Sequence, residues 1–307
     1  MNLKHLKKVL YNPLIPLSYL WVAMSPLIKS SERFLKVYYR MRTGKRLNLD
    51  NPVSFQDKTQ WLKLRYTDPL YTKLVDKYAV RQFVAERIGE EHLIPLLGVY
   101  DRFEDINFDS LPNQFVLKAT HDSGSVVICK DKRCFDIEAA RKKLNKSLKR
   151  NYFWKGREYP YKNVPPRIVA EQFMVDEGNN GQIPDYKFFV FNGKPEMLFV
   201  AEGRFSKEGA SFTFLDMDWN VMPIFAKGHE GTGAHIAPLK PACYEEMKDI
   251  VEKLCLDIPY HRVDLYTINN KVYFGEYTFF HDGGVVLFSP DEWNYKLGEM
   301  IKLPADL

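Results

Sequence analysis

Two short apolar segments near the C-terminal end of the chain carry an arginine and two carboxylates. Arg262 and Asp264 alternate with apolar residues in one segment, and Glu276 lies in the next. Residues two apart in a strand share a face, so Arg262 and Asp264 belong together. Two carboxylates about 4 Å apart repel by roughly 4 kcal/mol at an effective dielectric near 20, and one arginine offsets only part of this. A bound Mg²⁺ or Mn²⁺ ion would resolve the repulsion, because oxygen-only ligands suit these cations. The alternative is a surface ion pair on a solvated sheet.

The connection between the two segments decides whether the two carboxylates share a face. A two-residue turn at Asn269-Asn270 would pair Asp264 with Gly275 and turn Glu276 to the opposite face. A three-residue loop with Asn270 in the left-handed conformation would bring Asp264 and Glu276 together. We therefore expect a connection of odd length. We also expect Asp264→Asn and Glu276→Gln to cost little stability, since each would relieve repulsion in the metal-free protein.

The elements that must position these residues are strands and helices in mixed order. Asp68 and Pro69 are typical of a helix start, and Gly89 is a natural stop, so a helix is expected between them. A second helix is expected from Asp136 to about Arg150. Asn192-Gly193 predicts a two-residue hairpin turn. Several hairpins among helices indicate an α+β fold with antiparallel sheets, and the Rossmann and Walker glycine patterns are absent.

The chain has 307 residues and a net charge of +5, unevenly distributed. Residues 1–45 carry nine Lys or Arg and a single acid, while residues 132–157 carry ten and two acids. Both stretches are candidate contacts for anionic partners, although a solvated helix face explains the second equally well. The four cysteines form no C-x-x-C pair and the histidines no zinc pattern, which favours reduced thiols and no zinc site.

Val9 to Ile28 is a run of 20 residues without a formal charge, interrupted by three prolines. Its length could cross a bilayer. A cleaved signal, a spanning helix, an interfacial segment between basic flanks and a helical extension docked on the protein all stay open. We expect residues 1–45 to be removable without loss of the folded core.

An ordered set of five segments carries a resemblance to one known family. The segments are NPVSFQDKTQWLK, LVDKYAVRQFV, LIPLLGVYDRFEDINFDSLPNQFVLKATHDSGSVVICKD, DYKFFVFNGKPE and RVDLY…FGEYTF, from about Leu47 to the C-terminus. The chain resembles the TupA-like ATP-grasp family of polysaccharide gene clusters. The resemblance implies two α+β lobes with antiparallel sheets that hold ATP between them. It also implies a helical extension (1–46), a helical part of the core (47–110), a lid subdomain (111–174) and a C-terminal subdomain with the metal and substrate site (175–307).

The resemblance further implies a nucleotide site. In it, Lys77 and Lys118 would point at the phosphates, and the small-residue loop after Lys118 would offer backbone N–H groups to them. The hinge strand would read adenine, and two residues of a later strand would contact ribose and phosphate. The loop residues are Ser123, Gly124 and Ser125, those of the hinge strand are Glu171 and Phe173, and those of the later strand are Asp185 and Lys187.

The same resemblance implies roles in catalysis and metal binding. Arg262 and Lys187 would neutralise charge on the transferring phosphate, and Arg204 would add positive charge nearby. Asp264 and Glu276 would bind Mg²⁺ or Mn²⁺. Many ATP-grasp enzymes close with Glu-x-Asn, whereas this chain has Thr278 in the third place. A threonine hydroxyl can bind magnesium but is a weaker ligand than an amide carbonyl.

The activity of the family implies an ATP-dependent ligase. ATP would phosphorylate a carboxylate, and an amine would displace phosphate to leave an amide. The expected partners are a uronic-acid carboxylate of a cell-surface glycan or its precursor and an amino acid or other amine. We expect no nucleic acid, and a cytoplasmic protein with peripheral contact to an anionic membrane at its inner face.

Two rival functions stay open from the sequence. Asp216-x-Asp218 resembles the metal-binding motif of glycosyltransferases that use nucleotide sugars, although the neighbouring Trp and Asn favour a hairpin turn. The other rival is a non-catalytic, membrane-associated protein of the same pathway. The presence of Lys118, Lys187 and the two carboxylates argues against it.

Overall fold

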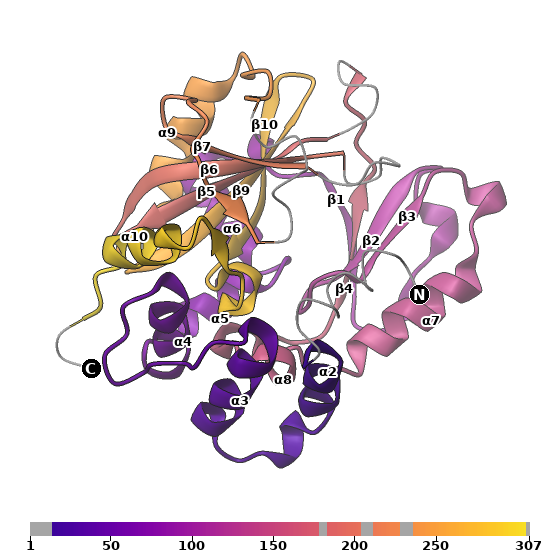
Figure 1. Cartoon of the computed structure of the whole chain (residues 1–307). Helices are drawn as coiled ribbons and strands as arrows, with labels where there is room; N and C mark the ends of the chain where they lie inside the picture. The colour runs from indigo at the N-terminus through magenta and orange to yellow at the C-terminus, as the bar shows by residue number, and fades with distance from the viewer. Residues whose placement is uncertain (1–13, 178–182, 204–210, 228–235, 305–307) are drawn as a thin grey trace.

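The structure is a computed structural model that describes residues 14–177, 183–203, 211–227 and 236–304. A four-stranded and a five-stranded antiparallel sheet lie on opposite sides of the molecule, with the N-terminal helices below both in the view of Figure 1. Helices and antiparallel sheets alternate along the chain. The predicted α+β class is therefore confirmed.

The smaller sheet has the order β1-β4-β2-β3. Its strands are β1 (Leu96–Tyr100), β2 (Phe115–Ala119), β3 (Val126–Cys129) and β4 (Ile168–Gln172). Asp136 caps helix α7 (Ile137–Leu148) by accepting from the Ala139 N–H, as its sequence predicts. Leu144 of α7 and Phe115 of β2 belong to one buried cluster, so this helix closes one face of the sheet.

The larger sheet has the order β10-β9-β5-β6-β7 and lies in the main core. Its strands are β5 (Asp185–Phe191), β6 (Lys194–Glu202), β7 (Ser211–Asp216), β9 (Tyr260–Ile268) and β10 (Lys271–Thr278). Asn192 and Gly193 both have positive φ, at 49° and 78°, and connect β5 to β6 in the predicted two-residue hairpin. All seven residues of β5 are buried, so polar groups on this strand must find partners inside the protein.

Three further helices and a small sheet surround the larger sheet. Helix α9 (Tyr244–Leu254) lies against it, and Met247 and Val251 join the main core. Helix α10 (Glu292–Met300) packs on α4 (Phe55–Arg65). Strands β8 (Phe225–Ala226) and β11 (Phe288–Ser289) form a two-stranded sheet.

The helix expected between Asp68 and Gly89 is two helices, α5 (Pro69–Val75) and α6 (Val80–Ile88). The prediction of one helix was wrong because of Asp76. Its carboxylate accepts from the N–H groups of Tyr78 and Ala79 and pairs with Arg167 at 2.8 Å. An aspartate side chain that accepts from the backbone N–H groups two and three residues later competes with helical hydrogen bonds. Here α5 ends just before Asp76, and a new helix begins at Val80.

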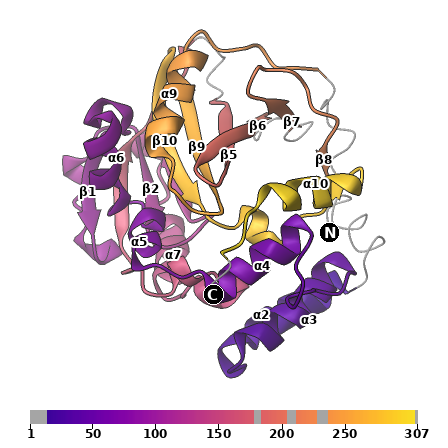
Figure 2. The same ribbon diagram turned by 90° about the vertical axis from the view of Figure 1, so that its left-hand side faces the viewer.

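The N-terminal helices pack side by side along the lower edge of the molecule, as Figure 2 shows from a second direction. They are α2 (Ile15–Ala23), the short 3₁₀ helix η1 (Ser25–Leu27) and α3 (Ser31–Thr43). Phe34, Leu35 and Tyr39 of α3 belong to the main core. Removal of residues 1–45 would expose part of that core, so the expectation of a folded remainder stays a prediction, which urea denaturation of the truncated chain would check. Among the described residues, no helix is long and apolar enough to cross a membrane.

The hairpin of β9 and β10 differs from the expected one in its connection. Ile268 pairs with Lys271, so the turn at Asn269-Asn270 has two residues, both with positive φ. The prediction of an odd-length connection was wrong. A β-bulge at Gly275 supplies the extra residue instead, and Glu276 lies directly opposite Asp264. The two carboxylates share a face because the bulge changes the register after Phe274.

Candidate functional site

Asp264 is the centre of a buried ionic cluster on the larger sheet. Arg262 donates to it twice, with Nε 2.6 Å from Oδ1 and Nη2 2.8 Å from Oδ2, and Lys187 also donates to Oδ2. Lys187 of β5 lies directly opposite Asp264 of β9, so the sheet register brings the three ions together. Burial raises the pKa of Asp264, but Arg262 and Lys187 outweigh it and lower the pKa to about 2.

Asp185 adds a second carboxylate to this cluster. It is buried two residues before Lys187 on the same face of β5, and its Oδ2 lies 3.6 Å from the Lys187 ammonium. The resemblance implies that both residues contact nucleotide. In the structure they form part of one ionic cluster with Asp264 and Arg262.

Glu276 is the more accessible of the two candidate metal ligands. Its side chain is 41% exposed, and its Oε1 lies 4.0 Å from Nη2 of Arg262. Thr278 accepts a hydrogen bond from the same nitrogen at 3.0 Å. Asp264, Glu276 and Thr278 thus offer oxygen atoms on one face. No group of three His, Cys, Asp or Glu that could hold a metal ion occurs within the described ranges.

This donor set fits Mg²⁺ or Mn²⁺ that takes its other ligands from phosphate and water. The fit depends on the half-exposed carboxylate of Glu276, because both oxygens of Asp264 already accept from Arg262 and Lys187. Carboxylate and hydroxyl oxygens suit Mg²⁺ or Mn²⁺ better than zinc, which prefers sulfur and imidazole ligands. When bound, such an ion would supply positive charge for phosphate oxygens.

His281 is a member of the cluster that sequence reasoning missed. It lies in η8 (His281–Gly284), just after β10, and its Nδ1 is 2.6 Å from Nη1 of Arg262. An arginine can only donate, so this ring nitrogen accepts and the imidazole is neutral. Burial is the main cause that lowers the pKa of His281, and Arg262 adds to it. His281 therefore orients Arg262 without adding charge.

The lid residues Lys118 and Glu171 contact each other across the smaller sheet. Their ion pair is 2.5 Å long, and Arg81 of α6 lies 3.8 Å from the other oxygen of Glu171. The resemblance implies that Lys118 contacts phosphate and Glu171 contacts adenine. Phe173 follows the end of β4 and is half-buried. The structure thus brings together the lysine and the acid for which the resemblance implied separate contacts.

The loop after β2 is held by hydrogen bonds to Asp122, one of its own residues. Lys77 donates from Nζ to the carbonyl of Asp122 at 2.5 Å. The carboxylate of Asp122 accepts from the Ser125 hydroxyl at 2.5 Å and from Arg150 at 2.9 Å. Gly124 has a φ of 94° and open space around it, and both Ser123 and Gly124 are exposed. The tip of the loop is therefore exposed to solvent, whereas the Ser125 side chain is buried and bonded to Asp122.

Tyr152 is a half-buried residue beside this loop, and its hydroxyl accepts from Lys155 at 3.0 Å. Burial is the largest cause that raises the pKa of Tyr152, and a hydrogen bond with Ser123 opposes it. Arg204, another predicted site residue, lies outside the described residues.

Lys63 of α4 is a second functional candidate that the sequence reasoning missed. Its ammonium is buried and donates to the carbonyls of Gly156 at 3.0 Å and Gly283 at 2.6 Å. Gly156 ends the short helix α8 (Phe153–Gly156), and Gly283 lies in η8 beside His281. Gln56, Gln60 and Lys63 recur at helical spacing and are all buried, and this polar stripe could have indicated a role inside the protein.

Lys63 should make stability depend on pH above neutrality. Burial lowers its pKa to about 8, against the opposing effects of Glu158 and Asp282. Between this value and roughly 10.4, the unfolded chain binds the proton that the folded chain has lost, so the free energy of unfolding rises with pH. Urea denaturation between pH 7.5 and 10 should show a rise of up to about 3 kcal/mol in the wild type relative to Lys63→Met. Lys142→Met, at an exposed position, is the control, and parallel curves for wild type and Lys63→Met would contradict the assignment.

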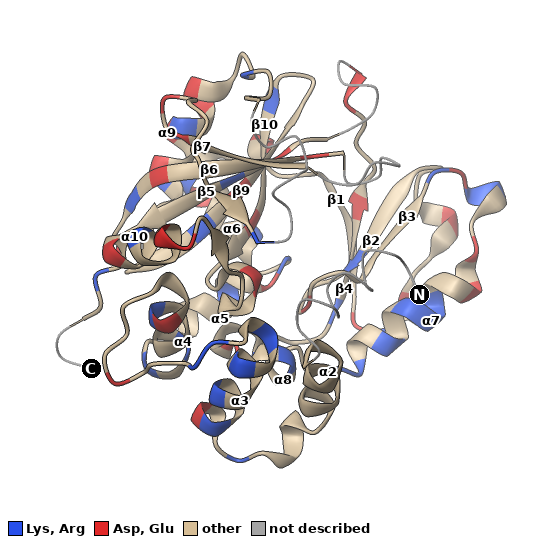
Figure 3. Ribbon diagram, viewed as in Figure 1, with Lys and Arg blue, Asp and Glu red and all other residues tan. Residues whose placement is uncertain are grey.

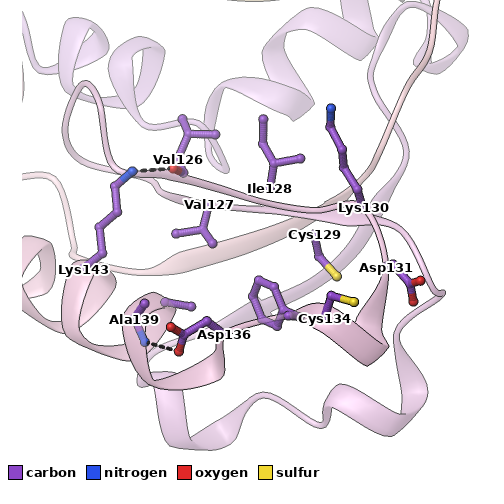
Figure 4. Close-up of a pocket in the computed structure, with 12 residues that line it drawn as sticks. Val126, Val127, Ile128, Cys129, Lys130, Asp131, Cys134, Asp136, Ala139 and Lys143 are labelled. Carbon is purple, nitrogen blue, oxygen red and sulfur yellow. Dashed lines mark hydrogen bonds between the residues drawn. The ribbon is translucent and has the colours of Figure 1, made fainter.

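A surface hollow lies apart from these residues. It is bounded by β3 and α7, and Val126, Ile128, Cys129, Cys134 and Lys143 are among its lining residues, as Figure 4 shows. None of the predicted site residues lines it. The candidate site is therefore placed by buried charge and convergent side chains, not by the size of a cavity.

Comparisons with known proteins place the chain in a family. A sequence model of the TupA-like ATP-grasp family matches residues 57–302. No curated protein matches the sequence. Among solved structures, the D-alanine–D-alanine ligase of Bacillus anthracis complexed with ATP is 16% identical over 67% of this chain and 55% of its own, with a TM-score of 0.37. This chain thus matches little more than half the length of that ligase.

Two other solved structures show a similarly distant likeness. The D-alanine–D-alanine ligase of Helicobacter pylori is 16% identical over 82% of this chain and 70% of its own, with a TM-score of 0.38. An ATP-grasp RimK domain protein of Sphaerobacter thermophilus is 14% identical over 75% of this chain and 67% of its own, with a TM-score of 0.39. The family is therefore given by the sequence model and not by these structures. Because that match spans about four-fifths of the sequence, the chain belongs to the TupA-like ATP-grasp family.

Proposed function

We propose that this protein is an ATP- and Mg²⁺-dependent ligase that forms an amide bond through an acyl phosphate. The observation that carries the proposal is the convergence of Lys187, Arg262 and Asp264 with Glu276 on one face of the larger sheet. Two cations and two carboxylates at one place can hold both phosphate oxygens and a metal ion. Membership in an ATP-grasp family indicates that the phosphate donor is ATP.

The reaction requires no nucleophile from the protein. An oxygen of the acceptor carboxylate attacks the γ-phosphorus of ATP, and ADP leaves. The nitrogen of an amine then attacks the acyl carbon, phosphate leaves, and the nitrogen loses a proton. Lys187 and Arg262 would stabilise charge on the phosphoryl oxygens, and His281 would hold Arg262 in place. Lys118 of the lid would exchange its contact with Glu171 for a phosphate.

The acceptor in this proposal is a uronic-acid carboxylate of a cell-surface polysaccharide or its precursor, and the amine is that of an amino acid. The resemblance to enzymes of polysaccharide gene clusters motivates this choice. A basic face on α7 supports an anionic acceptor, and Figure 3 shows the blue segments of this helix beside the smaller sheet. Its exposed members are Arg141, Lys142, Lys143, Lys146, Lys149 and Arg150.

The glycosyltransferase alternative receives no support from the structure. Asp216 accepts from the N–H groups of Asp218 and Asn220 through one oxygen and from the Asn220 side chain through the other. Its carboxylate therefore closes a turn after β7, as the neighbouring residues predicted. Both oxygens accept hydrogen bonds from residues no more than four positions further along the chain.

Nucleotide binding and turnover test the proposal together. Calorimetry should show ATP binding that requires Mg²⁺, and no binding of UDP-sugars. Incubation with ATP, Mg²⁺ and a panel of uronic sugars and amino acids should release ADP only with a matching pair. Lys187→Met should abolish that release, whereas Lys253→Met, at an exposed position of α9, should leave it unchanged. Binding of a UDP-sugar without binding of ATP would overturn the proposal, and ATP binding without turnover on any pair would support the non-catalytic alternative.

A further inference from the structure

Helix α2 and the 3₁₀ helix η1 expose a continuous apolar stripe. Leu17, Leu20, Met24 and Leu27 follow one another at steps of three, four and three residues, so their side chains share one face. Leu17 is 48%, Leu20 64% and Leu27 82% exposed. Isolated exposed leucines are common on protein surfaces, but a run of them on one helix face marks an interaction site.

The opposite face of α2 is fixed to the protein, so the stripe has a defined orientation. Ser18 and Ser25 are fully buried. The indole of Trp21 donates to the carbonyl of Phe34 at 3.1 Å, and the two rings stack with centroids 6.0 Å apart. The apolar stripe therefore does not belong to a loose terminal tail. It is a surface that the fold presents.

Arg157 is the main anchor of this surface. Its guanidinium is buried and donates through Nη2 to the carbonyls of Ser25 at 2.5 Å and Ile28 at 2.7 Å. The same group lies over the ring of Trp154, 4.6 Å from its centroid. Two charged hydrogen bonds to the end of η1 hold the backbone where the apolar stripe ends.

The residues that follow the stripe are strongly basic. Lys29, Arg33, Lys36 and Arg40 are exposed, and Glu32 is the lone acid between Lys29 and Arg42, paired with Lys36 at 2.7 Å. Figure 2 shows α3 alongside α2, and Figure 3 shows the cationic bands of α3 next to the uncharged ribbon of α2. Apolar and cationic surface thus occur together on neighbouring helices.

We propose that the α2–η1 stripe lies in the surface of an anionic lipid bilayer, with the basic residues of the following segment on the lipid headgroups. A helix of nine residues is only about 14 Å long, which is too short to cross the hydrocarbon core but sufficient to lie in its plane. An apolar face enters the acyl boundary, and neighbouring Lys and Arg are attracted by anionic headgroups. The charge next to the stripe favours this occupant over an uncharged apolar partner.

Vesicle binding by the full-length protein tests this surface. Liposomes with about a third of phosphatidylglycerol should retain the wild type, liposomes of phosphatidylcholine alone should retain it far less, and added salt should weaken the retention. The double variant Leu20→Ser/Leu27→Ser should lose at least tenfold in partition coefficient. Leu239→Ser is the matched control, because Leu239 is 93% exposed and lies outside the stripe. Arg33→Gln/Arg40→Gln should lower retention only on anionic vesicles, with Lys142→Gln/Lys146→Gln as its control.

Several results would overturn the proposal. Equal retention of the wild type and the leucine variant would show that the stripe is not the contact. Sedimentation that reveals a dimer in the wild type and a monomer in the leucine variant would assign the stripe to a second copy of the chain.

Unchanged ATP binding and thermal unfolding in all variants would show that any loss of retention comes from the surface itself. Failure of vesicle binding leaves the ligase proposal untouched, because that proposal rests on ADP release.

Discussion

Glu276→Gln should lower turnover by about a hundredfold or more and leave the folded state nearly as stable as the wild type. In the proposed function, the carboxylate would help to hold the metal ion that acts on the reacting phosphate, and loss of one such stabilising group typically costs two to three powers of ten. The side chain is 41% exposed and lies 4.0 Å from Arg262, its one ion-pair partner in the described residues. Loss of its charge therefore disrupts few contacts inside the protein.

Asp264→Asn should also abolish turnover, but at a large cost in stability. Asp264 is fully buried and pairs with both Arg262 and Lys187. Loss of its charge leaves Lys187 with the 3.6 Å contact to Asp185 and Arg262 with the 4.0 Å contact to Glu276. Breaking a buried ion pair in this way typically costs about 3–5 kcal/mol. The expectation that both changes would relieve repulsion was therefore wrong for Asp264, because its neighbours are cations.

Urea denaturation and ADP release measured on the same samples separate the two effects. Glu196→Gln, at an exposed position of β6, should match the wild type in both measurements. Acid titration adds an independent check. Because the pKa of Asp264 is about 2 in the folded protein, its contribution is complete above about pH 4 and is lost as pH falls towards 2. Full stability of Asp264→Asn at pH 7 would rule out the buried pairs as a source of stability.

The second large effect should come from Gly275→Val. A Cβ at this position would lie 2.8 Å from a ring carbon of Tyr266 and 3.0 Å from the carbonyl oxygen of Asp264. The bulge cannot accept it without moving the backbone next to both candidate metal ligands. We expect turnover to fall by about a hundredfold, as for the loss of a stabilising charge, with ATP binding weakened.

Deletion of Gly275 is the matched control for this prediction. It removes the extra residue but keeps Phe274 opposite Leu265 and Glu276 opposite Asp264, as in a regular hairpin. The deletion should therefore retain more turnover than the valine variant. Circular dichroism and thermal unfolding would show whether each variant is folded. Wild-type turnover in a folded Gly275→Val protein would show that the bulge does not position Glu276.

The sequence was sufficient to predict the family, the ATP-grasp fold and the hairpin at Asn192-Gly193. Motif order and turn chemistry are local properties, and they survive in the folded protein. The candidate site could be predicted only as a set of residues. The sequence placed Asp264 near Arg262 because two residues along a strand is a fixed distance, but it gave no reason to pair Asp264 with Lys187.

The missing parts depend on contacts between distant segments. Lys187 and Asp264 are 77 positions apart, and only the register of β5 against β9 joins them. A glycine inside a strand can mark a bulge, a bend or a close approach, so Gly275 alone could not specify the register. Lys63 looked like an ordinary helix residue because its two carbonyl partners come from segments that are more than 90 residues away.

Gly156 and Arg157 are neighbours in the chain, and each connects to a different part of the protein. The carbonyl of Gly156 accepts from Lys63, which also holds Gly283, while the side chain of Arg157 holds the ends of η1 and the following residues. The N-terminal helices, the end of α8 and the segment after β10 therefore form one cooperative unit. Local opening at any of the three would break buried charged hydrogen bonds, so we expect the helices that carry the apolar stripe to unfold together with the segments that Lys63 and Arg157 hold, and not before them.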